Sequence, residues 1–539
     1  MKKYLLVLVS LCCVLSAAFA ENPDYPELKK SDANIIGHVL DKKTKEHLPY
    51  ITVALKGTTI GTVTDATGHY FLKNLPEGSF VLEVSSVGYK TLTRNVTLKR
   101  GKTLEEDFEI EEDAIALDGV VVSANRSETT RRLAPTLVNV VDLKLFETTN
   151  SSTLSQGLNF QPGVRVETNC QNCGFQQVRI NGLDGPYTQI LIDSRPVFSA
   201  LSGVYGLEQI PASMIERVEV MRGGGSALFG SSAIAGTINI ITKEPLRNSG
   251  QLSHTITSVG GSSSFDNNTS LNASLVTDDH RAGLYIFGQN RHRSGYDYDG
   301  DGFTELPELK NQTVGFRSYL KTSTYSKLTF EYHHMQEFRR GGDMLDRPPH
   351  EAHIAEQLQH SIDGGSLKYD YFSPNEKNRL SIFASAANTD RDSYYGPGND
   401  PLKAYGKTTD LIAMGGAQYV HTFDKCLFMP SDLTAGLEYN RDRLKDNMWG
   451  YDRHTDQTVN IYSAFLQNEW KNERWSILVG GRLDKHNMVD NIIFSPRANL
   501  RFNPTQNINL RLSYSSGFRA PQAFDEDMHC LLYTSDAAD

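Results

Sequence analysis

One acidic stretch of the sequence has the spacing of a calcium-binding loop. YDYDGDGFTELPELKN follows the pattern D-x-D-x-D-G-x5-E, in which oxygen ligands alternate along a tight turn. Its candidate ligands are the side chains of Asp297, Asp299, Asp301, Glu305 and Glu308, and the backbone carbonyl of Phe303. The flanks have strand patterns and Pro307 stiffens the exit, which departs from a helix-flanked site. The pattern therefore predicts a weak Ca²⁺ site, with a solvated acidic loop as the alternative.

A second pair of reactive side chains lies at Cys170 and Cys173, in a C-x-x-C spacing. In an oxidising compartment this pair forms a small disulfide, or it stays reduced and contacts a metal chelate. A disulfide across so short a loop adds little chain-entropy stabilisation, so its role would be local shape. No nucleophile–base pair or metal triad stands out elsewhere, so the sequence predicts no enzyme and no required cofactor.

The compartment follows from the first twenty residues. Lys2 and Lys3 precede an apolar run, and Ala18-Phe19-Ala20 forms a small-residue cleavage site, so residues 1–20 are predicted to be a signal peptide. The rest of the chain has no apolar run of the ~20 residues that a transmembrane helix needs. An exported chain of this kind is either soluble or inserted in a membrane as a β-barrel. The net charge of −10 argues against nucleic acid as a partner.

Long alternating segments begin near residue 248. Leu433, Ala435, Leu437 and Tyr439 alternate with polar residues, and Ile508 begins a similar segment. Short links such as 503–507 interleave with long polar loops such as 340–357, which is typical of an outer-membrane barrel. A soluble antiparallel sandwich alternates too, but its connections lack this asymmetry. The pattern predicts roughly thirteen strands over residues 248–529 of a transmembrane antiparallel β-barrel.

Residues 33–112 have a different pattern, with short strands separated by turn residues about every ten positions. This pattern predicts a small β-sandwich. The segment resembles the carboxypeptidase-regulatory-like domain, and the resemblance rests on Gly57-Thr58, Gly61-Thr62, Thr64-Asp65, Gly68, Leu75-Pro76, Gly78 and Val87-Gly88-Tyr89. No zinc-ligand cluster is evident from the sequence of this domain, so the resemblance implies no peptidase activity.

Residues 130–245 carry many short motifs in one register. These are Leu154-Ser155-Gln156-Gly157-Leu158, Pro162-Gly163-Val164, Arg179-Ile180-Asn181-Gly182, Leu191-Ile192-Asp193 and Ile215-Glu216-Arg217-Val218-Glu219-Val220. In this region the chain resembles the plug domain of TonB-dependent outer-membrane receptors. The resemblance implies that IERVEVMRGGGSALFGSSAIAGTINIITK joins two strands of a small plug sheet. Residues 227–230 and 238–243 resemble the signature of iron-chelate and cobalamin receptors.

The resemblance also implies a function. A scarce, large ligand, most simply a metal chelate (siderophore, haem or cobalamin), binds outer loops and the plug, and the TonB–ExbB–ExbD complex of the inner membrane drives its import. The alternative is a surface receptor that binds a protein or glycan without importing a chelate. A surface lipoprotein is a further candidate partner, and outer-membrane lipid surrounds the barrel.

Two sets of site residues follow from the resemblance. The TonB box and linker occupy residues 117–124, where a β-branched strand can add to another sheet, and the N-terminal domain and this box are expected in the periplasm. The box residues are Asp118, Gly119, Val120, Val121, Val122 and Ser123. The plug-apex ligand candidates are Asn169, Cys170, Cys173, Phe175, Arg195, Phe198 and Tyr205. The overall expectation is a mostly β chain with a small N-terminal β-sandwich, an α/β plug and an incomplete barrel.

The last ten residues, CLLYTSDAAD, do not continue the barrel pattern. They resemble the in-frame translation of a sequencing adapter. We therefore expect residues 530–539 to be a non-native tail, Cys530 to have no function, and the gene to encode roughly nine more strands toward the 22 that the family's barrels have.

Overall fold

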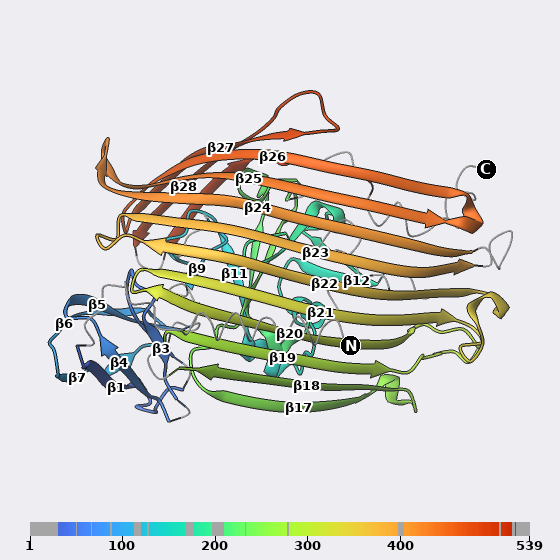
Figure 1. Ribbon diagram of the computed structural model, residues 1–539, viewed down its shortest axis with the longest axis horizontal. Helices are drawn as coiled ribbons and strands as arrows, with labels where there is room; N and C mark the ends of the chain where they lie inside the picture. Colours follow the sequence, from blue (N-terminus) through green and yellow to red (C-terminus); the bar gives the residue numbers. More distant parts are fainter. Residues whose placement is uncertain are drawn as a thin grey trace, which may run out of the picture.

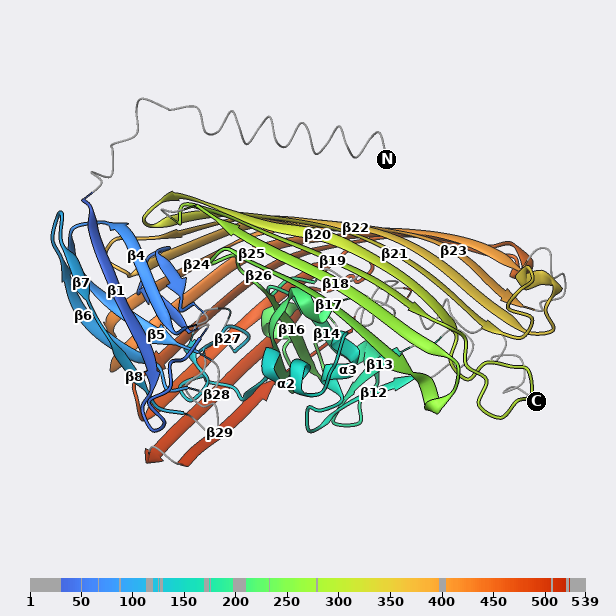
Figure 2. The same ribbon diagram turned by 90° about the horizontal axis from the view of Figure 1, so that it is seen from below.

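The computed structural model consists of a sandwich, a plug and a strongly curved sheet (Figures 1 and 2). The structure describes residues 31–49, 51–65, 67–86, 89–112, 120–124, 126, 129–168, 174, 176–196, 210–231, 233–277, 280–396, 404–505, 508–519 and 523. The predicted signal peptide and the predicted non-native tail lie outside the described residues.

The N-terminal domain is a sandwich of two four-stranded sheets. One sheet has the order β4-β1-β7 with β8 also paired to β1, and the other has the order β3-β2-β5-β6. Alternate residues of each strand point between the sheets, where Ile35, Val53 and Leu72 are buried with their neighbours. The strands are β1 (Ala33–Asp41), β2 (Thr52–Leu55), β3 (Gly61–Val63), β4 (His69–Leu75), β5 (Gly78–Ser85), β6 (Leu92–Leu98), β7 (Thr103–Glu105) and β8 (Phe108–Ile110).

The plug is built on a four-stranded mixed sheet of order β11-β15-β16-β14, with two small two-stranded sheets beside it. Its buried core contains Leu158, Ile180, Val218 and Ile238, and in Figure 2 its elements lie within the concave side of the large sheet. The elements are β9 (Val120–Val121), β10 (Thr129–Thr130), β11 (Val138–Asp142), α2 (Leu143–Thr148), α3 (Leu154–Leu158), β12 (Val164–Thr168), β13 (Gln176–Ile180), η1 (Gly185–Tyr187), β14 (Thr188–Ile192), η2 (Ala212–Met214), β15 (Ile215–Arg222), α5 (Ser226–Phe229) and β16 (Gly236–Thr242).

The glycine-rich stretch joins β15 to β16, which pair in antiparallel fashion. Gly223 and Gly230, on either side of α5, have φ angles of +83° and +80°, a region that side chains other than glycine rarely adopt. At Gly236 a Cβ atom would come within 2.5 Å of the Met221 carbonyl oxygen. The small residues are therefore needed for the turns and for close backbone packing, and the prediction of two joined plug strands is confirmed.

The large sheet has thirteen strands, each antiparallel to its neighbours, in sequence order from β17 to β29. This count matches the prediction. Among the described residues β17 and β29 do not pair with each other, so the sheet is an open, curved wall. The strands are β17 (Ser249–Ser258), β18 (Phe265–Val276), β19 (Ala282–Arg293), β20 (Glu308–Ser323), β21 (Ser326–Gly342), β22 (Ala355–Phe372), β23 (Asn378–Gly396), β24 (Tyr405–Cys426), β25 (Met429–Met448), β26 (Arg453–Lys471), β27 (Trp475–His486), β28 (Ile493–Thr505) and β29 (Ile508–Ser515).

The two ends of this wall differ in their connections. At one end the strands turn through short links such as 324–325 and 472–474, and at the other they are joined by longer segments such as 294–307 and 343–354. We call these the turn end and the loop end. The predicted link at 503–507 is shorter than expected, because β28 continues through Thr505.

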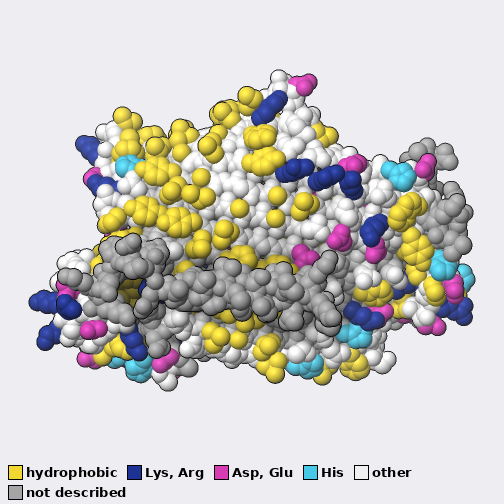
Figure 3. Space-filling model, viewed as in Figure 1, with side chains coloured by type: hydrophobic (Ala, Val, Ile, Leu, Met, Phe, Trp, Pro, Cys, Tyr) yellow, Lys and Arg dark blue, Asp and Glu magenta, His cyan; other side chains and the backbone are white. Residues whose placement is uncertain are grey.

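The two faces of the wall differ in polarity. Leu510 and Leu512 on β29 are 56% and 70% exposed on the outer face, and apolar side chains are spread over that face in Figure 3. The inner face holds polar side chains such as Arg339 and Arg391, both almost fully buried. Apolar-out and polar-in alternation is expected of a barrel in lipid. No helix in the described part of the chain is both long and apolar enough to cross a membrane.

The sandwich lies against the turn end. The Thr59 amide donates to the Thr324 carbonyl oxygen at 3.1 Å, in the link between β20 and β21. Gly57 lies against Glu376 in the link between β22 and β23. The sandwich and the acidic loop, which falls in 294–307, are therefore at opposite ends of the wall (Figure 1).

Candidate functional site: the coupling segment and the plug

The described part of the predicted TonB box lies inside the plug. We call residues 120–126, as far as they are described, the coupling segment. Its strand β9 pairs antiparallel with β10, Val121 opposite Thr129. The Val121 side chain is fully buried and packs with Ala124, Ala134 and Val138. Asp118 and Gly119 lie outside the described residues.

A buried carboxylate holds the end of the box. Glu219 on β15 is fully buried, and its Oε2 accepts hydrogen bonds from the Val122 and Ser123 amides, both at 2.9 Å, and from the Ser123 hydroxyl at 2.8 Å. Its Oε1 lies 3.0 Å from Arg217 Nε, which balances the charge. A buried charge is stable only when it is paired and hydrogen-bonded in this way. We call this set of contacts the Glu219 clasp.

Asn239 on β16 completes the clasp. Its amide nitrogen donates to Ser123 Oγ at 3.0 Å and to Ser194 Oγ at 3.0 Å. Asn239 is directly opposite Glu219 in the β15–β16 register. Both side chains therefore point to the same side of the sheet, so the pairing of two core strands positions both groups that hold the box.

Arg126 connects the coupling segment to the barrel wall. It is ion-paired with Glu438 on β25, and its guanidinium lies 5.0 Å from the ring centroids of both Phe229 and Phe465. Glu438 also accepts from Arg482 Nη1 at 2.6 Å, and Arg482 Nη1 donates to the Leu228 carbonyl oxygen. Burial lowers the pKa of Arg126 and the nearby Glu438 raises it, with a net pKa below its usual range.

Arginines of the last strands hold the backbone around this segment. Arg497 on β28 donates to the Ala124 carbonyl oxygen at 2.5 Å. Arg511 on β29 donates to the carbonyl oxygens of Arg131 at 2.8 Å and Ala134 at 3.2 Å. The chain from the box to β11 thus runs along the inner wall and bonds to it through its backbone.

A second set of plug–wall contacts anchors the far side of the plug sheet. Asp193 accepts from the Thr242 hydroxyl at 2.7 Å and is ion-paired with Arg317 on β20. Burial raises the pKa of the Asp193 carboxyl, but Arg317 and the hydrogen bonds from Thr242 together lower it more, and the net pKa lies below its usual range. Glu244 lies 2.9 Å from Lys327 Nζ on β21. Burial raises the pKa of Glu244, but Lys327 and then Arg317 lower it, to about 2.

Of the predicted plug-apex residues, the structure describes only Arg195; Asn169, Cys170, Cys173, Phe175, Phe198 and Tyr205 lie outside the described residues. Gly174 lies at the loop end, where its carbonyl oxygen accepts from Arg339 at 3.1 Å. Arg195 does not lie there. It is 7% exposed and packs 4.8 Å from the Phe383 ring centroid in the turn-end half of the wall. The reason is that β14 is parallel to β16, which leads directly into the first wall strand at the turn end.

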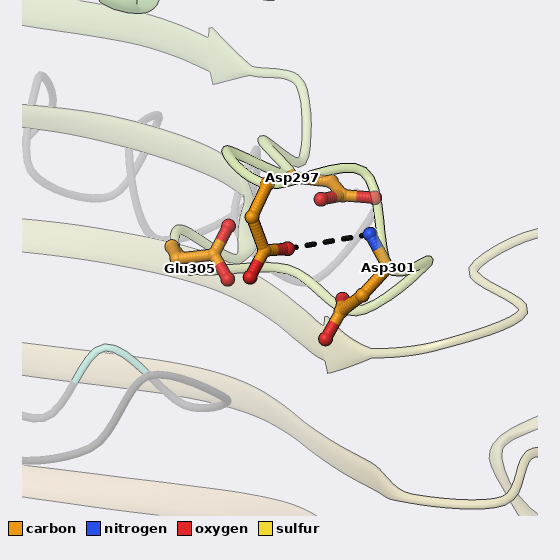
Figure 4. Close-up of side chains that lie close together, drawn as sticks. Asp297, Asp301 and Glu305 are labelled. Atoms are coloured by element: carbon orange, nitrogen blue, oxygen red, sulfur yellow. Dashed lines mark hydrogen bonds between the residues drawn. The ribbon is translucent and has the colours of Figure 1, made fainter.

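The acidic loop gathers four of its predicted ligands. Asp297, Asp299, Asp301 and Glu305 each place a carboxylate oxygen within 4.8 Å of the others, as Figure 4 illustrates for the three labelled there. Asp297 also accepts from the Gly300 and Gly302 amides, at 2.7 and 2.9 Å. Glu308 lies apart, in β20, where it is 2.7 Å from Lys310 Nζ. The backbone conformation of this loop thus brings together every carboxylate of the predicted set except Glu308.

Sequence reasoning missed the residues that hold the box. Glu219 and Asn239 belong to motifs that predict plug strands, and nothing in those motifs indicates a contact with Ser123, 96 and 116 positions earlier. One signal was available. Charged and amide side chains at Glu219 and Asn239 interrupt otherwise buried β-branched strands, which indicates a partner in the core.

The three parts of the fold match known families. Residues 35–122 match the CarboxypepD_reg-like domain, residues 130–237 match the TonB-dependent Receptor Plug Domain, and residues 237–528 match the TonB dependent receptor-like, beta-barrel family. The chain belongs to the TonB-dependent receptors. The barrel match alone covers more than half of the sequence. Members of this family are transporters or receptors of the outer membrane, and their fold makes this chain an outer-membrane protein.

Individual relatives agree with this assignment. The chain is 25% identical over 424 residues to the vitamin B12 transporter BtuB of Vibrio vulnificus strain CMCP6, covering 76% of the chain and 64% of that protein. In fold it is similar to the siderophore receptor PirA of Acinetobacter baumannii (TM-score 0.62, 19% identity, 72% of this chain and 62% of that one). It is also similar to a ferric enterobactin receptor PfeA mutant of Pseudomonas aeruginosa (TM-score 0.61, 19% identity, 72% and 63%). The chain spans slightly less than two thirds of each.

Proposed function

We propose that this receptor imports a scarce metal chelate, a siderophore, haem or a cobalamin, with energy supplied through the TonB box at Asp118–Ser123. One observation supports the proposal above the others. A short β-branched segment, Val120–Val122, lies outside the central plug sheet and is held there by a polar clasp, so we expect that it can be withdrawn while that sheet stays intact. Once released, such a segment can pair as a strand with a partner protein.

The two ends of the wall support one direction of transport. The sandwich lies against the turn end, which is the periplasmic end in barrels of this kind. The loop end then faces outward, and ligand binds there. In this orientation a pull on the box from the periplasm acts directly on β15 and β16, because Glu219 and Asn239 hold it to those strands.

A chelate also suits the polar interior near the loop end. Arg391 and Thr408 lie close together there, and Asp446 accepts from the Thr408 hydroxyl at 2.6 Å. Such an interior replaces the water around a large hydrophilic ligand with hydrogen bonds. The names of relatives support the same class, because one is a vitamin B12 transporter and others are siderophore receptors.

Uptake in cells tests the proposal. A strain without the gene, and the same strain carrying it, are given radiolabelled cyanocobalamin, haemin and a panel of ferric siderophores. We expect accumulation of one class only in the complemented strain. If no chelate accumulates while a protein or glycan binds the complemented cells, the chain is a surface receptor of the alternative kind, and the import proposal is wrong.

A further inference from the structure

Three histidines of the sandwich domain lie together on its outer surface. The ring centroids of His38 and His47 are 5.1 Å apart, those of His47 and His69 are 5.0 Å apart, and those of His38 and His69 are 5.7 Å apart. In the described part of the chain, the contacts of the coupling segment and those between sandwich and barrel involve other residues. The function proposed above does not use this group.

The strand register explains how residues so far apart in sequence meet. His38 on β1 is directly opposite His69 on β4. The chain after β1 turns back, and His47 forms a bridge with Leu40, two positions after His38 and on the same face. Val39, between them, points into the core instead. Gly68 has no side chain to block this arrangement, since a Cβ there would come within 2.8 Å of the His47 Cβ.

The spacing of the rings fits one shared metal ion. Three imidazoles bound to a tetrahedral ion at about 2.0 Å from nitrogen to metal have ring centroids roughly 5 Å apart. Among the described residues, only the acidic loop has three or more possible ligand atoms that all lie within 4.8 Å of one another. The ring nitrogens of the three histidines do not all lie this close together in the present side-chain conformations. At least one imidazole must therefore turn about its χ2 bond to bind a metal.

Neighbouring side chains fix which ring nitrogen carries the hydrogen in His38 and His69. Asp65 Oδ1 accepts from the Thr67 hydroxyl at 2.7 Å, so the Thr67 oxygen must accept the hydrogen of His69 Nδ1, 3.1 Å away. Asp107 Oδ1 lies 3.1 Å from His38 Nδ1 and can only accept from it when ionised. Both rings then carry their hydrogen on Nδ1 and leave Nε2 as the metal-binding atom. Such partners are typical of the histidines that bind metals.

We propose that His38, His47 and His69 form a binding site for a divalent first-row transition metal of the imidazole-preferring kind, Zn²⁺, Cu²⁺ or Ni²⁺. Three neutral nitrogen ligands leave a further position for water or another ligand, and they discriminate against Ca²⁺ and Mg²⁺, which prefer oxygen. The site is separate from the acidic loop, which lies at the other end of the barrel wall.

Metal titration of the detergent-solubilised chain tests the site. Cysteine thiols are first alkylated, and millimolar Ca²⁺ is added to occupy carboxylate sites, so that neither competes for the probe. Zn²⁺ binding is then followed by calorimetry, and Cu²⁺ binding by electron paramagnetic resonance, in which imidazole nitrogens split the signal. We expect one site with nitrogen coupling. His47→Ala is the first variant, because that side chain is exposed and makes no contact within the core, and it should weaken binding on the order of 100-fold.

Two more variants distinguish metal binding at this site from non-specific metal binding by other histidines. Asp107→Asn keeps the side-chain shape and should weaken binding by about 10- to 100-fold, through the loss of the carboxylate partner of His38. His254→Ala removes an exposed histidine of β17 and should change nothing. Equal binding by the wild type and His47→Ala, or the absence of nitrogen coupling from Cu²⁺, overturns the proposal. Either result leaves the transport function unaffected, because that function is measured by chelate uptake.

Discussion

The plug meets the barrel wall in two regions that are built differently. On one side the wall contacts a segment outside the central plug sheet, through Arg126 and through backbone carbonyls such as that of Ala124. On the other side it contacts the sheet directly, through Asp193 and Glu244 at the ends of β14 and β16. We therefore expect that the first region can come away while the sheet stays folded, and that loss of the second would shift the sheet itself. On this basis we propose that the first region couples energy and that the second anchors the plug.

The most severe test of this comparison is a proline in the coupling segment. Val121→Pro removes an amide hydrogen and fixes φ, so the box can no longer pair as a regular strand. We expect uptake to be abolished while ligand binding to cells stays at the wild-type level. Val121→Ala keeps the amide and should retain most of the uptake. Normal uptake by the proline variant would mean that the box lies elsewhere.

The Glu219 clasp can be weakened without touching the box. Glu219→Gln keeps the shape of the side chain but removes the negative charge of the oxygen that accepts three hydrogen bonds. This change should weaken the attachment of the segment by about 1–3 kcal/mol. We expect the Val122 and Ser123 amides to exchange hydrogen about 10- to 100-fold faster. The matched control is Glu167→Gln on β12, a plug carboxylate that is paired with Arg165 and Arg179 and not with the box. Unchanged exchange at both amides would show that the clasp does not hold the segment.

The anchoring region should respond to acid. The pKa of Glu244 is lowered in the folded protein, from an ordinary 4.5 to about 2. The ion pair with Lys327 therefore stabilises the folded protein fully above about pH 4.5, and this stabilisation is lost as the pH falls toward 2. The free energy of unfolding should fall by no more than about 3 kcal/mol over this range. Glu244→Gln should remove this part of the pH dependence of the thermal midpoint, and Glu351→Gln, in the 343–354 loop, should not. Identical acid profiles for the Glu244 variant and the wild type would contradict the anchoring role.

The smallest effect is expected at the acidic loop, which is far from both regions. Ca²⁺ should raise the thermal midpoint of the wild type slightly, at millimolar concentration, through Asp297, Asp299, Asp301 and Glu305. Asp299→Ala should abolish that shift, while Asp346→Ala, at the same end of the wall, should keep it. If Asp299→Ala leaves calcium binding and the midpoint in calcium unchanged, the loop is solvated and binds no ion.

The sequence predicts the elements well because each has a local pattern. Alternation of apolar and polar residues around Leu510 identifies the wall strands, and the glycines at 223 and 230 identify the turns between plug strands. The direction of a connection is not local. Arg195 was expected near the ligand, yet β14 pairs parallel to β16 and carries it toward the turn end. No residue near Arg195 indicates that pairing.

The contacts that hold the site are also beyond a sequence pattern. Ser123 and Glu219 are 96 positions apart, and Arg126 and Glu438 are 312 apart. The histidines of the sandwich show the same limit on a smaller scale. Their spacing follows no metal motif, and strand pairing brings them together, through His38 opposite His69 and through the bridge between Leu40 and His47. Side-chain clusters of this kind depend on register, which a single sequence specifies only weakly.

The central claim is that movement of the coupling segment, driven from the inner membrane, causes import. Its most direct test is chelate accumulation by cells that carry the receptor, measured with and without a protonophore that collapses the proton gradient, with surface binding measured in parallel. The account predicts that the protonophore removes accumulation and leaves binding at the outer surface unchanged. Accumulation that continues at the same rate in de-energised cells would contradict it.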